Sequence, residues 1–87
     1  MHAVVIKATI TDRPALPTTL TELVPAVSGA PGFVAGYWIL LGQNRGIAIL
    51  LFDTEDSASL QAIATQVAGS DAATIDSVEV GEVAAQA

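Results

Sequence analysis

The chain has 87 residues, which is enough for one small domain. Its 3 basic residues against 9 acidic ones give a net charge of −6, and so few cations exclude a phosphate-binding surface. We therefore expect neither nucleic acid nor an anionic membrane as a partner, and the absence of cysteine excludes disulfides and thiolate metal sites.

The first predicted elements are a strand over residues 2–11 and a helix that begins between Pro14 and Thr19. Apolar residues fill the even positions of the strand, a period of two that is typical of one buried face. Thr19 and Glu22 have the spacing of a capping box, and Pro25 inside the helix predicts a kink. The predicted buried stripe of this helix consists of Leu20, Leu23, Val24 and Val27.

Two continuous apolar runs follow, over residues 33–41 and 47–52. Neither run alternates with polar residues, so we expect both faces of each strand to be covered. The short polar loop from Gly42 to Gly46 predicts a hairpin between them. No run reaches the roughly 20 residues of a membrane span and no signal-peptide pattern precedes the first strand, so we expect a cytoplasmic protein.

A second helix is predicted to start at residues 53–56, where acidic residues and a capping hydroxyl suit a helix N-terminus, and to end at Gly69. Its predicted buried stripe is Leu60, Ile63, Ala64 and Val67. The last strand is predicted from Thr74 to Ala85, with a bulge near Gly81.

The order βαββαβ predicts an α+β, ferredoxin-like fold: a four-stranded antiparallel sheet with two helices on one face. The other face of the sheet would remain bare. An apolar patch of several hundred Å² is unusual for a soluble monomer. We therefore predict a homodimer formed through the open sheet face.

The sequence resembles the dimeric α/β-barrel superfamily, close to its antibiotic-biosynthesis-monooxygenase-like members. The resemblance is carried by the apolar hairpin and by three segments, residues 22–27, 30–33 and 52–56. The resemblance spans nearly the whole chain and implies one dimeric α/β-barrel domain over residues 1–87, with a pocket on the sheet face of each subunit. Relatives include cofactor-independent oxygenases of aromatic polyketides, haem-degrading enzymes, small isomerases and dehydratases. Fold alone does not choose among these activities.

The candidate ligand-binding residues are Lys7, Thr9, Tyr37 and Trp38, and no catalytic residue is assigned. Tyr37 and Trp38 are adjacent on one strand, so one points to the helix-side core and the other into the barrel. Lys7 on the mixed face of the first strand is either a base or electrostatic stabiliser or, as we favour, the partner of a last-strand carboxylate such as Glu79.

No metal site or cofactor is predicted. His2 is the only histidine and stands near the start of the first strand, where a partly exposed strand-end residue is the favoured interpretation. The haem-degrading relatives hold haem through a histidine of the second helix, and residues 54–68 contain none.

Three functions are compatible with these residues. The favoured one is a homodimer that binds a small apolar or aromatic metabolite between the sheet and the partner subunit. The alternative is a cofactor-independent monooxygenase- or isomerase-like enzyme acting on an aromatic, polyketide-type substrate. The third is a structural dimer with a filled interior. No catalytic constellation is visible, so enzymatic activity stays open.

Overall fold

Within residues 1–68 and 72–87, which this computed structural model describes, the chain forms four strands and two helices in the predicted order βαββαβ. Side chains are described for these residues except 66–68. The elements are β1 (His2–Ile10), α1 (Leu16–Ser28), β2 (Phe33–Leu41), β3 (Arg45–Phe52), α2 (Glu55–Ala68) and β4 (Ala73–Glu82).

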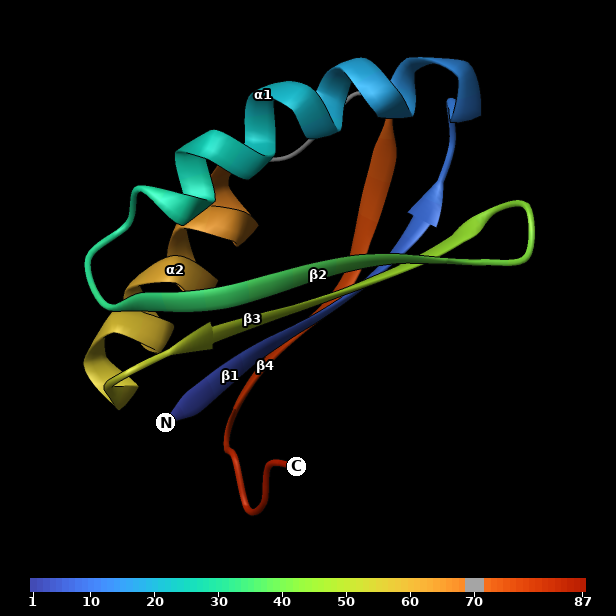
Figure 1. Cartoon of the computed structure of the whole chain (residues 1–87). Coiled ribbons are helices and arrows are strands. Elements are labelled where there is room, and N and C mark those ends of the chain that lie inside the picture. Colours follow the sequence, from blue (N-terminus) through green and yellow to red (C-terminus); the bar gives the residue numbers. More distant parts are fainter. Residues whose placement is uncertain (69–71) are drawn as a thin grey trace.

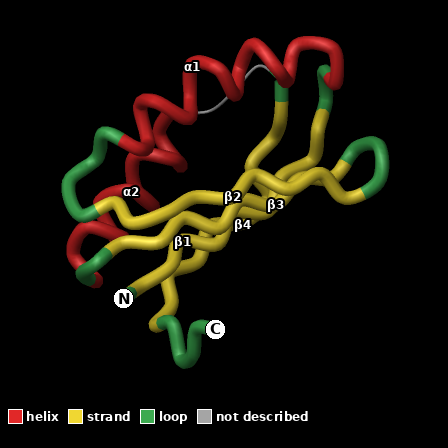
Figure 2. Tube along the Cα trace, viewed as in Figure 1, coloured by secondary structure: helices red, strands yellow, loops and turns green. Residues whose placement is uncertain are grey.

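The four strands form one antiparallel sheet in the order β2-β3-β1-β4. Both helices lie on the same side of it (Figure 1), and the described residues place no helix on the other side (Figure 2). The helix α1 contacts mainly β2, whereas α2 packs on β1, β3 and β4. The ferredoxin-like fold expected from the sequence is thereby confirmed.

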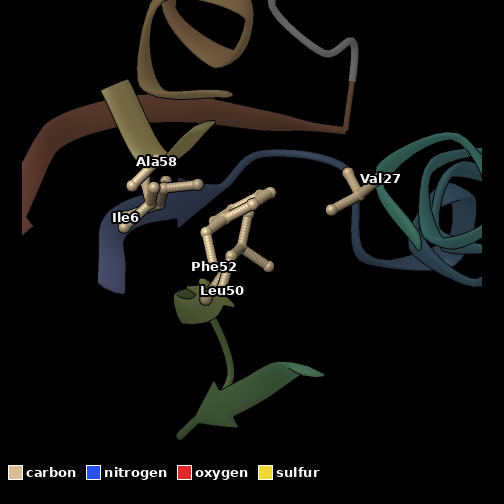
Figure 3. Packing of buried hydrophobic residues seen from close by; sticks show 7 residues of the cluster. Ile6, Val27, Leu50, Phe52 and Ala58 are labelled. Atoms are coloured by element: carbon tan, nitrogen blue, oxygen red, sulfur yellow. The ribbon is translucent and has the colours of Figure 1, made fainter. Parts of the chain in front are cut away.

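The hydrophobic core lies between the helices and the sheet. Figure 3 shows Leu50 and Phe52 of β3, with Val27 of α1 and Ala58 of α2 contributed from the helix layer. The ring of Phe33 meets that of Phe52 edge to face, with 5.8 Å between their centroids. The buried residues of this core are Val4, Ile6, Val27, Ala48, Leu50, Phe52 and Ala58.

The helix α1 begins within the predicted window between Pro14 and Thr19, but without the predicted capping box. A short 3-10 turn capped by Asp12 leads directly into the helix at Leu16. Because Thr19 therefore lies inside the helix, its hydroxyl donates to the carbonyl oxygen of Ala15 at 3.2 Å and forms no capping box. Pro25 lies within the helix, as the sequence indicates.

The buried stripe of α1 is only partly the predicted one. Val27 is buried and Leu20 is half-buried, but Leu23 and Val24 are exposed. Leu16, at the first helical position, is buried in their place.

The predicted buried stripe of α2 is wrong. The side chains of Leu60 and Ile63 are 69% and 59% exposed, and Ala64 is exposed as well. Ala58 and Ala62 pack against the core instead. These small side chains allow the backbone of α2 to lie close to the sheet.

The N-terminal cap of α2 is as predicted, because the hydroxyl oxygen of Thr54 accepts from the backbone N–H of Ser57 at 3.2 Å. The side chain of Val67 and the helix end predicted at Gly69 lie outside the described residues. In the part of the chain that the structure describes, neither helix is long and apolar enough to cross a membrane.

The bulge in β4 lies at Asp76, not near Gly81 as predicted. The register between β1 and β4 shifts after Lys7, which leaves Asp76 as the extra residue of β4. Ile75 and Val78 both pack against the core although they are three residues apart, and the extra residue between them makes this possible.

Candidate functional site

A cavity of about 340 Å³ lies between the helices and the sheet, and we name it the helix-side cavity. Its volume falls within the roughly 300–1,000 Å³ typical of small-molecule sites. All four strands and both helices contribute to its walls. Large apolar side chains in the lining include Ile6, Ile10, Leu16, Leu20, Val27, Trp38, Leu50 and Ile75.

Small residues explain why this space is not filled by side chains. Packing at normal density requires bulky groups to face each other across the gap between a helix and a sheet. Here much of the lining has little or no side chain: Ala8, Ala26, Gly46, Ala48, Ala64 and Ala73.

Polar groups in the cavity wall are few and uncharged. The lining residues that carry a polar group are Thr19 of α1, Gln61 and Thr65 of α2, and Trp38 of β2. Thr65 donates its hydroxyl to the carbonyl oxygen of Gln61 at 2.9 Å and accepts from Nε2 of the same residue at 3.2 Å. Among the described lining residues there is no acid, lysine, arginine or histidine.

The structure decides which of the two adjacent aromatic residues faces which side. Trp38 pairs with the core residue Ala48, is half-buried and lines the helix-side cavity. Tyr37 pairs with Ile49 on the opposite face and is 56% exposed. The aromatic residue on the open sheet face is therefore Tyr37.

Lys7 and Thr9 lie on the open sheet face, on the same side as Tyr37. The hydroxyl of Thr9 donates to Oδ2 of Asp76 at 2.7 Å across the bulge. A second cavity of about 350 Å³ lies here, lined by Lys7, Ala8, Leu41, Arg45, Gly46, Ile47, Asp76 and Ser77.

Lys7 does not pair with Glu79, which was its favoured partner. Its neighbour across the ladder is Ser77, while Glu79 stands opposite Val5. Lys7 is exposed and forms no ion pair within the described part of the chain.

The four predicted site residues therefore do not form one site. Three face the open side and only Trp38 lines the helix-side cavity. Gln61 and Thr65 were not predicted to be cavity residues. The sequence does contain a pattern that indicates these two residues. A second stripe at helical spacing, made of small and polar residues, runs along the same helix: Ala58, Gln61, Ala62 and Thr65.

His2 is half-buried near the start of β1, with Nε2 4.0 Å from Oε2 of Glu55. Its Nδ1 is buried and has no hydrogen-bond partner among the described residues. In residues 1–68 and 72–87, no three histidine, cysteine or acidic side chains are grouped closely enough to hold a metal ion.

No family model and no curated protein matches the sequence. Among solved structures, the chain is similar to SnoaB, a cofactor-independent oxygenase from Streptomyces nogalater. A mutant form of SnoaB aligns with a TM-score of 0.68 at 16% identity, covering 98% of this chain and 94% of that chain. A second SnoaB structure gives 0.62 at 19% identity, with 99% and 94% covered. At this level of identity the comparison shows the fold alone. That fold is the one expected from the sequence motifs.

Proposed function

We propose that this chain binds a small apolar or aromatic molecule in the helix-side cavity. The observation that carries the proposal is a cavity of about 340 Å³ whose wall is almost wholly aliphatic and aromatic. This places the ligand between the sheet and the helices of one subunit. The position predicted from the sequence was instead between the sheet and a partner subunit.

The chemistry of the wall selects the ligand. Removal of apolar surface from water stabilises a complex by roughly 25 cal/mol per Å². A charged ligand would lose its hydration and find no counter-charge among the described lining residues, which is strongly unfavourable.

A matched pair of alanine substitutions in β1 tests the site. Ala8 lines the cavity, whereas Ala3 lies on the same strand but on the open face. With tetralin, a bicyclic aromatic hydrocarbon, as the calorimetric probe, Ala8→Leu should weaken binding at least about tenfold, because the new side chain occupies ligand space. Ala3→Leu should change it little. Equal affinity in both folded variants, checked by circular dichroism, would reject this cavity as the site.

We further propose that a second copy of the chain covers the open sheet face. Exposed apolar side chains on this face include Tyr37, Ile39 and Leu41. The resemblance to dimeric α/β-barrel proteins supports the same arrangement. Such a dimer would cover the second face of β2 and β3, whose continuous apolar runs are otherwise unexplained.

A second candidate function is oxygenation of an aromatic substrate without a cofactor. The near-complete structural alignment with SnoaB, described as a cofactor-independent oxygenase, favours it. Anthrone is a suitable substrate, since one O₂ converts it to anthraquinone and water. Oxygen uptake that depends on protein concentration and is lost in Ala8→Leu would support this activity. Uptake at the uncatalysed rate would leave binding as the function.

A further inference from the structure

We propose that the second cavity, on the open sheet face, binds the carboxylate of a small aliphatic acid, and that Lys7 and Arg45 hold it there. We name this space of about 350 Å³ the open-face cavity. Its wall carries charged side chains, whereas the described lining of the helix-side cavity has none. The inference therefore concerns a second ligand, and it stands whether or not an apolar molecule binds on the helix side.

Two of the three basic residues of the chain line this one cavity, although they lie far apart in the sequence. Lys7 belongs to β1 and stands opposite Ile47 of β3. Arg45 of β3 stands opposite Thr9, the next residue of β1 on the same face. The two cations are therefore diagonal neighbours on the open face, and diagonal neighbours with long side chains can reach the same small group.

Neither of these cations has a counter-charge in the described part of the chain. Lys7 and Arg45 form no ion pair and no side-chain hydrogen bond there. The third basic residue, Arg13, is engaged elsewhere, because it donates to two carbonyl oxygens of the loop between β2 and β3. Both cations are also exposed, so their charged groups are open to an anion from solution.

The charges of the wall favour a single carboxylate over a dianion such as phosphate. Asp76 lines the same cavity, and its Oδ2 accepts from the hydroxyl of Thr9 at 2.7 Å instead of pairing with a cation. Two positive charges thus face one negative charge, and one carboxylate would balance them. A dianion would leave an excess of negative charge beside Asp76. The planar guanidinium of Arg45 also matches the two oxygens of a carboxylate.

The rest of the wall can take the apolar body of the acid. Leu41 and Ile47 line the cavity, and both side chains are aliphatic. Ile39 is the ladder partner of Ile47 and is 41% exposed, so the apolar surface continues along β2. A short alkyl chain would remove this surface from water, which adds to the affinity.

The proposed dimer makes an anion at this place more favourable. A second copy on the open sheet face would enclose Lys7 and Arg45 between two sheets, and unpaired charges are costly to enclose. A bound carboxylate would supply the missing counter-charge. The competing source is an acid of the partner subunit. Glu79 is the natural candidate, because it is exposed and lies on the open face, opposite Val5.

The first experiment compares hexanoate with hexanol, which have chains of equal length and differ in charge. Both are titrated at constant ionic strength and followed by ¹H–¹⁵N spectra. The backbone amides of Lys7 and Ser77 report on the open-face cavity, and those of Gln61 and Thr65 report on the helix-side cavity. Hexanoate should shift the open-face amides to saturation, and hexanol should bind there at least about tenfold more weakly. Hexanoate shifts confined to Gln61 and Thr65 would overturn the proposal.

The second experiment removes one cation. Arg45→Gln should weaken hexanoate binding at least about tenfold, because a charge-assisted hydrogen bond is lost. Gln86→Glu is the matched control: it makes the chain more negative by the same one charge, at an exposed residue near the C-terminus, which lies away from the β2–β3 hairpin (Figure 1). It should change the affinity little. An equal loss in both variants would mean that net charge, rather than this site, attracts the acid.

Two further measurements test the ligand class and the competing partner. Inorganic phosphate should shift the open-face amides more weakly than hexanoate, and tighter phosphate binding would refute the carboxylate assignment. Glu79→Gln should leave hexanoate binding unchanged. If hexanoate does not bind, and Glu79→Gln and Arg45→Gln weaken the dimer alike in sedimentation, the cations pair with the partner subunit and the site is rejected.

Discussion

Leu60 and Phe52 are both large apolar residues, yet the fold covers only one of them. Phe52 is fully buried between the sheet and the helices and contacts the ring of Phe33. Leu60 points outward from α2 and is 69% exposed. Hydrophobicity alone gives these residues equal weight, whereas the energy that each contributes depends on the area that folding removes from water.

We predict that Phe52→Ala lowers the free energy of unfolding by roughly 3–5 kcal/mol, because it leaves a cavity in the core. Leu60→Ala should lower it by less than about 1 kcal/mol, since little surface is buried there. Urea unfolding followed by circular dichroism measures both values. A loss at Leu60 as large as that at Phe52 would mean that α2 buries the stripe predicted from the sequence.

At the scale of secondary-structure elements, the position of α2 depends on a side-chain cap. Thr54 precedes the first residue of the helix, and its hydroxyl oxygen accepts from the N–H of Ser57. Glu55 and Asp56 in the first turn add a favourable interaction with the helix dipole. Because α2 packs on three of the four strands, fraying at this end would affect the sheet as well.

We predict that Thr54→Ala destabilises the protein by about 1 kcal/mol through loss of the cap. Thr54→Ser keeps a hydroxyl at the same position and should retain most of the stability. Thermal unfolding of the two variants gives the comparison. An equal loss in both would show that the methyl group, rather than the hydrogen bond, stabilises this turn.

The elements that the sequence predicted well are those with local signals. The hairpin loop between β2 and β3 is marked by glycine at each end and by polar residues between them. The buried face of α2 was mispredicted because two stripes with helical spacing overlap in one sequence, one of leucine and isoleucine and one with alanine at 58 and 62. Only packing against the sheet decides between them.

The helix-side cavity was beyond prediction for a related reason. A void depends on where α1 sits above the sheet, and no local pattern encodes that distance. The alanines of its wall also suit close packing, as Ala58 and Ala62 show on α2. The sequence did predict that Tyr37 and Trp38 take opposite faces, because that follows from the strand period alone.

At the scale of the whole molecule, the sheet separates two environments of different kind. On one side the helices and the sheet line the helix-side cavity. On the other side, no described part of the chain covers a row of exposed apolar residues along β2: Tyr37, Ile39 and Leu41. An 87-residue domain buries only about 60–65% of its unfolded surface, so covering this face would add stability that the small core lacks.

The two environments should respond independently to substitution, and this permits a sharp test of the dimer. We predict that the wild type sediments as a dimer at micromolar concentration and that Tyr37→Glu shifts it to a monomer, because a carboxylate on the open face would be buried without a partner. Leu60→Glu is the matched control: it replaces an apolar residue of similar exposure on the helix layer and adds the same charge. It should remain dimeric. A monomeric wild type would contradict the proposed interface, and a monomeric Leu60→Glu beside a dimeric Tyr37→Glu would move the interface to the helices. Tetralin binding within the helix-side cavity should survive in both variants, since neither residue lines it.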